Sequence, residues 1–83
     1  MDMEVRVLLF GPEADAMQSR FAVVEVEHPV TCDALRRALE ESHPALGPFL
    51  PAARFAINSE FAGADSLIKA GDEVALIGMV SGG

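Results

Sequence analysis

One stretch of the sequence, residues 31–43, has the apolar spacing of an amphipathic helix, whereas the other apolar segments have the alternating or continuous pattern of strands and turns. The apolar stripe of this stretch consists of Ala34, Leu35, Ala38 and Leu39. Thr31 is a typical N-cap residue, and Pro44 disfavours helical geometry at the residue before it. Asp33 and Arg37 have the spacing of a helical ion pair. A chain with one helix and several strands can bury its apolar residues by packing that helix on one face of a sheet.

Two segments with strand-like alternation precede the helix. Residues 5–10 and residues 20–27 both alternate apolar side chains between two faces. The polar segment between them, residues 11–19, is predicted to be a loop, and the sequence leaves the path of this loop open. Two strands joined by a single loop most simply form an antiparallel hairpin.

Further strand patterns follow the helix. Residues 54–58 and 60–62 are predicted to be strands, with a turn at Asn58-Ser59 between them. After a turn at Gly71-Asp72, residues 73–77 form a final strand that is almost continuously apolar, as is typical of a central strand covered on both faces. A short turn between the helix and these strands is expected to pack on the core through its apolar residues, Leu46, Phe49 and Leu50.

The element order β-β-α-β-(β)-β predicts an α+β protein with a β-grasp (ubiquitin-like) fold, in which a mixed sheet of four to five strands packs on one helix. A length of 83 residues allows a single domain, residues 1–83. A chain of this size buries only about 60–65% of its unfolded surface, which leaves little room for an internal active site. Hydrophobic residues make up 51% of the chain, so intrinsic disorder is excluded.

The chain is acidic, with 13 Asp and Glu side chains against six Lys and Arg and a net charge of −7. Binding to nucleic acids or to anionic membranes needs clustered basic residues, so neither kind of partner is expected. No secretory signal pattern and no apolar run long enough to span a bilayer is found in the sequence. The lone Cys32 cannot form an internal disulfide, and a cytoplasmic location is expected.

Side chains that could catalyse a reaction on their own are few. The many carboxylates are interpreted as a solvated acidic surface rather than as an acid–base pair. His28 and His43 lack a second His or Cys at metal-site spacing, and Gly11-Pro12 lacks the Lys and Ser/Thr of a phosphate-binding loop. Cys32 stands at the first helical position, where the helix dipole favours a thiolate and Asp33 opposes it, so its reactivity is left open. The sequence therefore predicts no cofactor bound by the chain itself, no metal site and no self-sufficient enzyme.

The end of the chain offers a different kind of site. Residues 78–83 are predicted to be a flexible tail behind the last strand, and such a tail extends at most about 20 Å. Because Gly82 and Gly83 have no Cβ, they fit a channel as narrow as a backbone. A carboxylate on this tail can reach a buried active site in another protein, and a frayed chain end is the alternative that composition leaves open.

The final strand and the end of the chain, Gly71-Asp72-Glu73-Val74-Ala75-Leu76-Ile77 and Val80-Ser81-Gly82-Gly83, resemble the ubiquitin-like sulfur carriers, most closely the small subunit of molybdopterin synthase, the MoaD type. The resemblance covers nearly the whole chain, and it continues through Val7-Leu8-Leu9-Phe10, Thr31 with Leu35, Ala38 and Leu39, Pro44-Ala45-Leu46, Ala56-Ile57-Asn58 with Glu60, and Leu67. Residues 11–17 depart from it, because they lack the Ala-x-x-Arg-Glu-like segment that often follows the first strand. Gly78-Met79 also depart, since many members have prolines or aromatics there.

The resemblance implies that the chemistry is divided among several proteins. A ubiquitin-activating-type adenylyltransferase would use ATP to convert the Gly83 carboxylate, itself a poor electrophile, into an acyl-adenylate, and a persulfide donor would supply sulfur to give a thiocarboxylate. In molybdopterin synthase the tail then enters the large subunit, in an expected heterotetramer, and delivers sulfur to cyclic pyranopterin monophosphate. By the same resemblance Gly82 gives clearance, Val80 and Ser81 line the insertion path, and Met79 packs at its mouth. Whether such a non-catalytic subunit counts as an enzyme is left open.

A partner surface is also expected on the sheet. Leu8 and Phe10 alternate against the apolar core side of their strand, so they are predicted to lie on the face away from the helix, with Phe21 and Val23 beside them. An exposed apolar patch suits docking on a larger subunit, and a self-covering face or a homodimer contact is the alternative. The sequence also leaves open sulfur carriage for thiamine, cysteine or tRNA thiolation, a β-grasp interaction module that is never activated, and a ubiquitin-like protein modifier.

Overall fold

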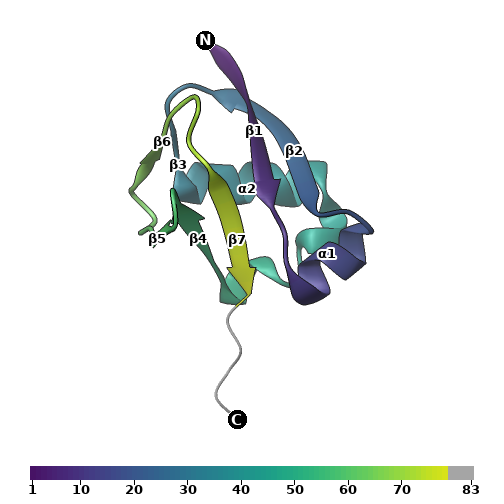
Figure 1. Ribbon diagram of the computed structural model, residues 1–83. Coiled ribbons are helices and arrows are strands. Elements are labelled where there is room, and N and C mark those ends of the chain that lie inside the picture. The colour runs from purple at the N-terminus through teal and green to yellow at the C-terminus, as the bar shows by residue number, and fades with distance from the viewer. Residues whose placement is uncertain (79–83) are drawn as a thin grey trace.

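A five-stranded mixed sheet organises the chain in the computed structural model, which describes residues 1–78 (Figure 1). The strands lie in the order β2-β1-β7-β4-β5, with β1 and β7 parallel and the other neighbours antiparallel. Their bounds are Asp2–Leu8 for β1, Phe21–Glu27 for β2, Ala53–Ile57 for β4, Glu60–Phe61 for β5 and Val74–Gly78 for β7. The predicted α+β fold, a mixed sheet of four to five strands packed on a helix, is confirmed.

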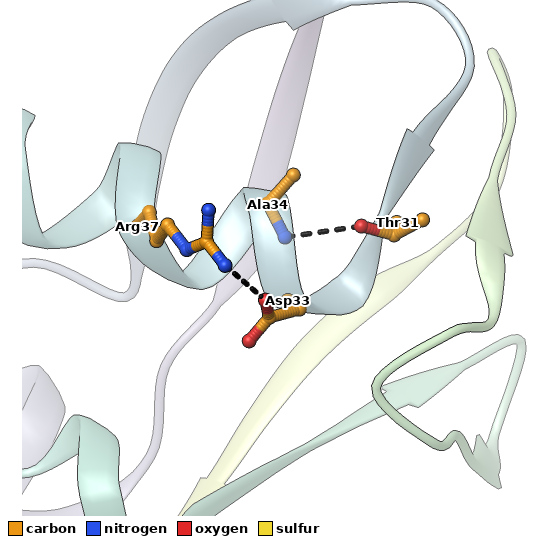
Figure 2. Close-up of polar contacts among 4 residues, drawn as sticks. All are labelled: Thr31, Asp33, Ala34 and Arg37. Atoms are coloured by element: carbon orange, nitrogen blue, oxygen red, sulfur yellow. Dashed lines mark hydrogen bonds and ion pairs between the residues drawn. The ribbon is translucent and has the colours of Figure 1, made fainter.

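Helix α2 (Cys32–Ser42) lies across one face of the sheet (Figure 1). Its first turn is closed by the Thr31 side chain, whose Oγ1 accepts a hydrogen bond from the backbone N–H of Ala34 at 3.1 Å. Figure 2 shows this cap beside the ion pair in which the Arg37 guanidinium donates to Asp33 Oδ2 at 2.7 Å. Both the N-cap and the ion pair are confirmed predictions, because each depends on residues three or four positions apart.

The hydrophobic core fills the space between α2 and the sheet. Leu35 and Leu39 of α2 are fully buried, and burying one such side chain contributes about 1.5–3 kcal/mol. Ala34, which was expected in the same stripe, is exposed, because one residue of an α-helix turns its side chain by about 100° from the next. The sheet residues in this core are Val5, Val7, Ala22, Val24, Ala53, Phe55, Val74 and Leu76.

The segment between β1 and β2 contains a helix, α1 (Gly11–Met17), so the predicted loop over residues 11–19 is wrong. Pro12 stands in the first turn, where backbone N–H groups have no hydrogen-bond partner within the helix, so proline loses nothing by lacking one. The fixed φ of proline also suits the helix. Gln18 ends the helix in a left-handed conformation with φ 51°. The pair Gly11-Pro12 is typical of a turn, and a helix of seven residues is too short for a periodic signal.

Two 3-10 helices connect α2 to β4 where a short turn on the core was predicted. They are η1 (Pro44–Leu46) and η2 (Leu50–Ala52). Leu46 and Leu50 are buried, as expected, and Phe49 between them is half-buried. The turn therefore closes the core beyond the end of α2.

A second, two-stranded sheet pairs β3 (Val30–Thr31) antiparallel with β6 (Leu67–Ile68). Neither strand was predicted, because two residues cannot show an alternating pattern. The Ile68 side chain is buried in the core, so this small sheet packs against it.

Strand β7 lies between β1 and β4 at the centre of the sheet, as predicted. Val74 and Leu76 point into the core, and the residues between and after them are half-buried on the opposite face. The predicted end of the strand at Ile77 is wrong, because Gly78 still pairs with Ala53 of β4. The neighbouring strand supplies a pairing partner that sequence alone does not reveal.

Candidate functional site

The predicted sulfur-bearing residue, Gly83, and the predicted insertion path of Met79, Val80, Ser81 and Gly82 lie outside the described residues. The structure shows where this tail starts. Gly78 closes β7 at the end of the sheet at which β1 also ends and β4 begins (Figure 1). Any protein that takes in the tail must therefore approach this end of the sheet.

Five residues, one from each strand, form a row across the sheet face opposite α2. In the strand register Leu8 pairs with Phe21 on one side and with Ala75 on the other, and Ala56 pairs with Ala75 and Phe61. Paired residues point to the same face, so these side chains lie next to one another. We call this set the transverse row: Phe21, Leu8, Ala75, Ala56 and Phe61. It has an aromatic ring at each edge and two alanines near its centre.

The small alanine side chains leave a groove of ≈ 300 Å³ beside Phe61. Phe10 and Ile77 also line it, and both lie toward the end of the sheet from which the tail leaves. Phe10 is 52% exposed and Phe61 is 57% exposed, which is high for large apolar side chains. Six of the eight residues that line the groove are apolar, the other two being Ser59 and Glu73, so it is a largely apolar surface that is continuous with the start of the tail.

The four predicted surface residues all lie outside the core. Three of them are exposed (Phe10, Phe21 and Val23), and Leu8 is half-buried. Their part in partner binding stays a prediction. Phe61 and Ile77 were not predicted for this surface, because Phe61 stands in a two-residue strand and Ile77 in a run interpreted as covered on both faces.

Arginine side chains cover both aromatic edges of the transverse row. The Arg6 Cζ atom lies 5.1 Å from the centroid of the Phe21 ring, and the Arg54 Cζ atom lies 4.9 Å from that of Phe61. These cation–π contacts hold the rings against the sheet. The face is thus apolar along its middle and carries a positive charge on each rim.

Glu13 of α1 lies beside the start of the tail, on the α2 side of the sheet. It is 4% exposed and is the one charged residue in the buried interior of the described part of the chain. A Cβ atom on Gly78 would lie 2.3 Å from Glu13 Oε1, so the carboxyl group occupies the space that a side chain at position 78 would need. No local pattern separates Glu13 from the other carboxylates, and the sequence analysis placed it on a solvated acidic surface.

The other candidate groups lie away from the tail. Cys32 is buried, and this burial raises the pKa of its thiol, an effect that the nearby charge of Arg36 partly opposes. His43 Nε2 lies 2.9 Å from the Val23 carbonyl oxygen, so this ring joins the end of α2 to the edge strand β2. Within residues 1–78, no three metal-ligating side chains come together. None of the helices in this range has the length and apolar content needed to cross a membrane.

Comparisons with known proteins agree with this arrangement. SAMP1 of Haloferax volcanii is 30% identical with a TM-score of 0.81, and the alignment covers 98% of this chain and 100% of that chain. A chain from the complex of subunits 1 and 2 of the Helicobacter pylori molybdopterin-converting factor is 26% identical with a TM-score of 0.68, and the alignment covers 98% of this chain and 100% of that chain. A putative molybdopterin converting factor subunit 1 from Pyrococcus furiosus, 16% identical with a TM-score of 0.78 over 94% of this chain and 99% of that chain, shares the fold.

A search of curated proteins finds no match to the chain. The model of the ThiS family matches residues 7–83, which is nearly the whole length. Together with the β-grasp fold shared with SAMP and molybdopterin converting factor structures, this match shows that the chain belongs to the ThiS family of ubiquitin-like sulfur carriers.

Proposed function

We propose that the chain is the sulfur-carrying small subunit of a molybdopterin synthase and acts in molybdenum cofactor biosynthesis in the cytoplasm. An adenylyltransferase joins the Gly83 carboxylate to the AMP part of ATP and releases pyrophosphate. A persulfide attacks the acyl carbon and displaces AMP, and a thiol then cleaves the acyl disulfide to leave a thiocarboxylate. The thiocarboxylate transfers its sulfur to cyclic pyranopterin monophosphate in the large subunit.

The observation that carries the proposal is the continuity between the apolar groove and the start of the tail. Phe10 and Ile77 line the groove, and Gly78 follows directly at the end of β7. A large subunit that covers the groove is therefore positioned to receive the residues that follow Gly78, of which Gly82 and Gly83 need least room.

The relatives support a subunit of this kind. The similar Helicobacter pylori chain, 26% identical, comes from a complex of subunits 1 and 2 of molybdopterin-converting factor. The exposed apolar groove would be buried in an analogous complex, which we propose to be a heterotetramer with a large subunit. The other proposed partners are the adenylyltransferase and the persulfide donor, and ATP binds to the former rather than to this chain.

Intact mass spectrometry tests the chemistry directly. Incubation with ATP, the adenylyltransferase of the same genome and a sulfur donor is expected to exchange one terminal oxygen for sulfur. Deletion of Gly83 is expected to abolish the exchange while leaving the fold intact. An unchanged mass with an enzyme that shows ATP–pyrophosphate exchange on this chain would sink the sulfur-carrier proposal.

The groove is tested by placing a charge in it. Ala75→Glu puts a carboxylate in the middle of the transverse row, and the affinity for the large subunit is expected to fall by about tenfold or more, because the charge must be desolvated on binding. Ala45→Glu, at an exposed position in η1, serves as the matched control and should leave the affinity nearly unchanged. Equal affinities for the two variants would contradict docking at the groove.

Protein modification is a second candidate function, favoured by the similarity to archaeal modifiers. A structure of the small archaeal modifier protein 1 of H. volcanii is 28% identical, and the alignment covers 93% of this chain and 98% of that chain. A covalent adduct between Gly83 and a lysine of a second protein, detected by tryptic mass spectrometry, would favour this function. Conversion of cyclic pyranopterin monophosphate by the loaded chain and the large subunit would instead exclude thiamine, cysteine or tRNA thiolation as its main pathway.

A further inference from the structure

We propose that Glu13 is a recognition point for the adenylyltransferase that takes in the tail to activate Gly83, and that this enzyme places an arginine side chain against the Glu13 carboxylate. The inference rests on the proposed function and deepens it, because it names the chemistry at the mouth of the partner's tail channel. It concerns a different surface from the groove, since Glu13 lies on the α2 side of the sheet and the groove on the opposite side.

Glu13 is largely buried. Its residue surface is 4% exposed, whereas Asp15, two positions later in the same helix, is exposed. A carboxylate removed from water is unfavourable unless a cation or hydrogen-bond donors replace the lost solvation. Glu13 therefore depends more than Asp15 on its small remaining contact with solvent, or on a group that replaces it.

Most of the six Lys and Arg side chains of this chain are engaged elsewhere, and in the described part of the chain none of them is paired with Glu13. Within residues 1–78, the one ion pair closer than 4.0 Å joins Arg37 to Asp33. Four of the five arginines have identified contacts away from Glu13: Arg6 with Phe21, Arg54 with Phe61, Arg37 with Asp33, and Arg36 with the carbonyl oxygens of Leu50 and Ala53. No side-chain or backbone hydrogen bond to the Glu13 carboxylate is formed by this part of the chain.

The Glu13 carboxyl group lies at the place where the tail starts. No fully buried polar side-chain atom in residues 1–78 lacks a hydrogen-bond partner, so the Glu13 oxygens must meet solvent or a group from beyond this range. The carboxyl group touches Gly78, where the tail starts, and a protein that draws in the tail covers this place and displaces that solvent. Covering a carboxylate without offering a cation disfavours binding, which selects a partner with a positive charge here.

Arginine fits this place better than lysine. Its planar guanidinium can donate two parallel hydrogen bonds to a carboxylate and is more weakly hydrated than an ammonium group, so it suits a partly buried ion pair. The net charge of −7 on this chain favours the approach of a basic surface.

Calorimetric titration of the adenylyltransferase of the same genome, without ATP, tests the inference. Glu13→Gln keeps the shape and removes the charge, and the dissociation constant is expected to rise by about tenfold or more, mainly through a faster dissociation rate. Asp15→Asn removes the same charge from an exposed position of the same helix and is expected to change the constant by less than about twofold. Thermal unfolding of Glu13→Gln at or above the wild-type temperature shows that the loss is not a loss of fold.

Arginine-to-alanine variants of the enzyme then locate the partner residue in double-mutant cycles. One of these enzyme variants is expected to bind the wild-type chain more weakly, and to bind Glu13→Gln about as well as the unmodified enzyme does. The inference is overturned if Glu13→Gln binds within twofold of the wild type, if Asp15→Asn weakens binding equally, or if no enzyme arginine couples to Glu13. A wild-type chain that binds but is never adenylated refutes the proposed function while the Glu13 comparison still gives an answer, and a wild-type chain that does not bind refutes both.

Discussion

At the start of β7 the side chains of Asn58 and Asp72 form a closed set of hydrogen bonds, whereas at its end the Glu13 carboxyl group has no donor among residues 1–78. Asn58 Oδ1 accepts from the backbone N–H of Glu73 at 2.9 Å, and Asn58 Nδ2 donates to Asp72 Oδ1 at 3.1 Å. Asp72 Oδ2 accepts from the backbone N–H of Lys69 at 2.8 Å. One strand thus joins a turn whose polar side chains bond one another to an end where the Glu13 carboxyl group has no hydrogen-bond donor within residues 1–78.

This difference separates stability from recognition. A hydrogen bond made within the protein contributes about 0.5–1.5 kcal/mol, and a buried polar group without a partner reduces stability. The turn at the start of β7 therefore stabilises the free chain, whereas Glu13 at the other end receives no such hydrogen bond from residues 1–78 and, by the proposal above, gains its ion pair on binding. Groups that serve binding often contribute little to the stability of the free protein.

The largest expected effect comes from opening the turn. Asn58→Ala should lower the free energy of unfolding by about 2 kcal/mol, because it removes the side-chain hydrogen bonds and forces alanine into a left-handed φ of 52°. Asn58→Gly tolerates that φ and should lose only about 1 kcal/mol. Urea unfolding measures both, and equal losses would show that the backbone conformation at position 58 has no influence.

A smaller effect of opposite sign is expected at the other end. Glu13→Leu should raise the free energy of unfolding by about 1–2 kcal/mol, because an apolar side chain replaces a largely buried carboxylate that has no hydrogen-bond donor among residues 1–78. Asp15→Leu, on the exposed side of α1, is the control and should give no comparable gain. If Glu13→Leu instead unfolds at a lower temperature in a circular dichroism melt, the free chain already satisfies this carboxylate.

The contact between Glu13 and Gly78 should appear as a coupling. Gly78→Ala places a Cβ 2.3 Å from Glu13 Oε1 and should cost about 1 kcal/mol, since the flexible end of Glu13 must move. In a Glu13→Ala background the same change should cost about 0.5–1 kcal/mol less. Gly63→Ala, where a Cβ meets no atom within 4 Å, is the matched control, and strictly additive values for the first pair would contradict the contact.

The smallest effect concerns pH. The backbone N–H of Lys69, followed by the Asn58 side chain, lowers the pKa of Asp72 below its ordinary value. A lowered pKa in the folded state stabilises the protein above the unfolded pKa, and this stabilisation is lost as the pH falls through the folded value. Asp72→Asn should therefore lower the melting temperature at neutral pH and have little effect in acid. Asp65→Asn, at an exposed position, should change little at either pH, and a constant deficit for Asp72→Asn at all pH values would contradict the role of its charge.

Features that depend on neighbouring positions were accessible from the sequence. The N-cap of α2, its ion pair and the central strand β7 were predicted, because each depends on spacing or composition within one segment. Helix α1 was missed because Gly11-Pro12 is a turn signal out of context, although proline also suits the first turn of a helix. The sequence predicted the part of the surface around Leu8 and Phe10 but not the part around Phe61, since Phe61 stands in a strand of two residues.

The sequence by itself determined the fold class, the family resemblance and the Gly82-Gly83 end, because helical and strand periods and backbone clearance are properties of local sequence. The tertiary structure alone decided that Leu8, Ala75 and Phe61 share one groove, because the register of β1, β7, β4 and β5 is set by pairing between distant segments. It also decided that Glu13 lies against Gly78. Among thirteen acidic residues, burial singles out this carboxylate, and burial depends on where α1 packs rather than on the residues beside it.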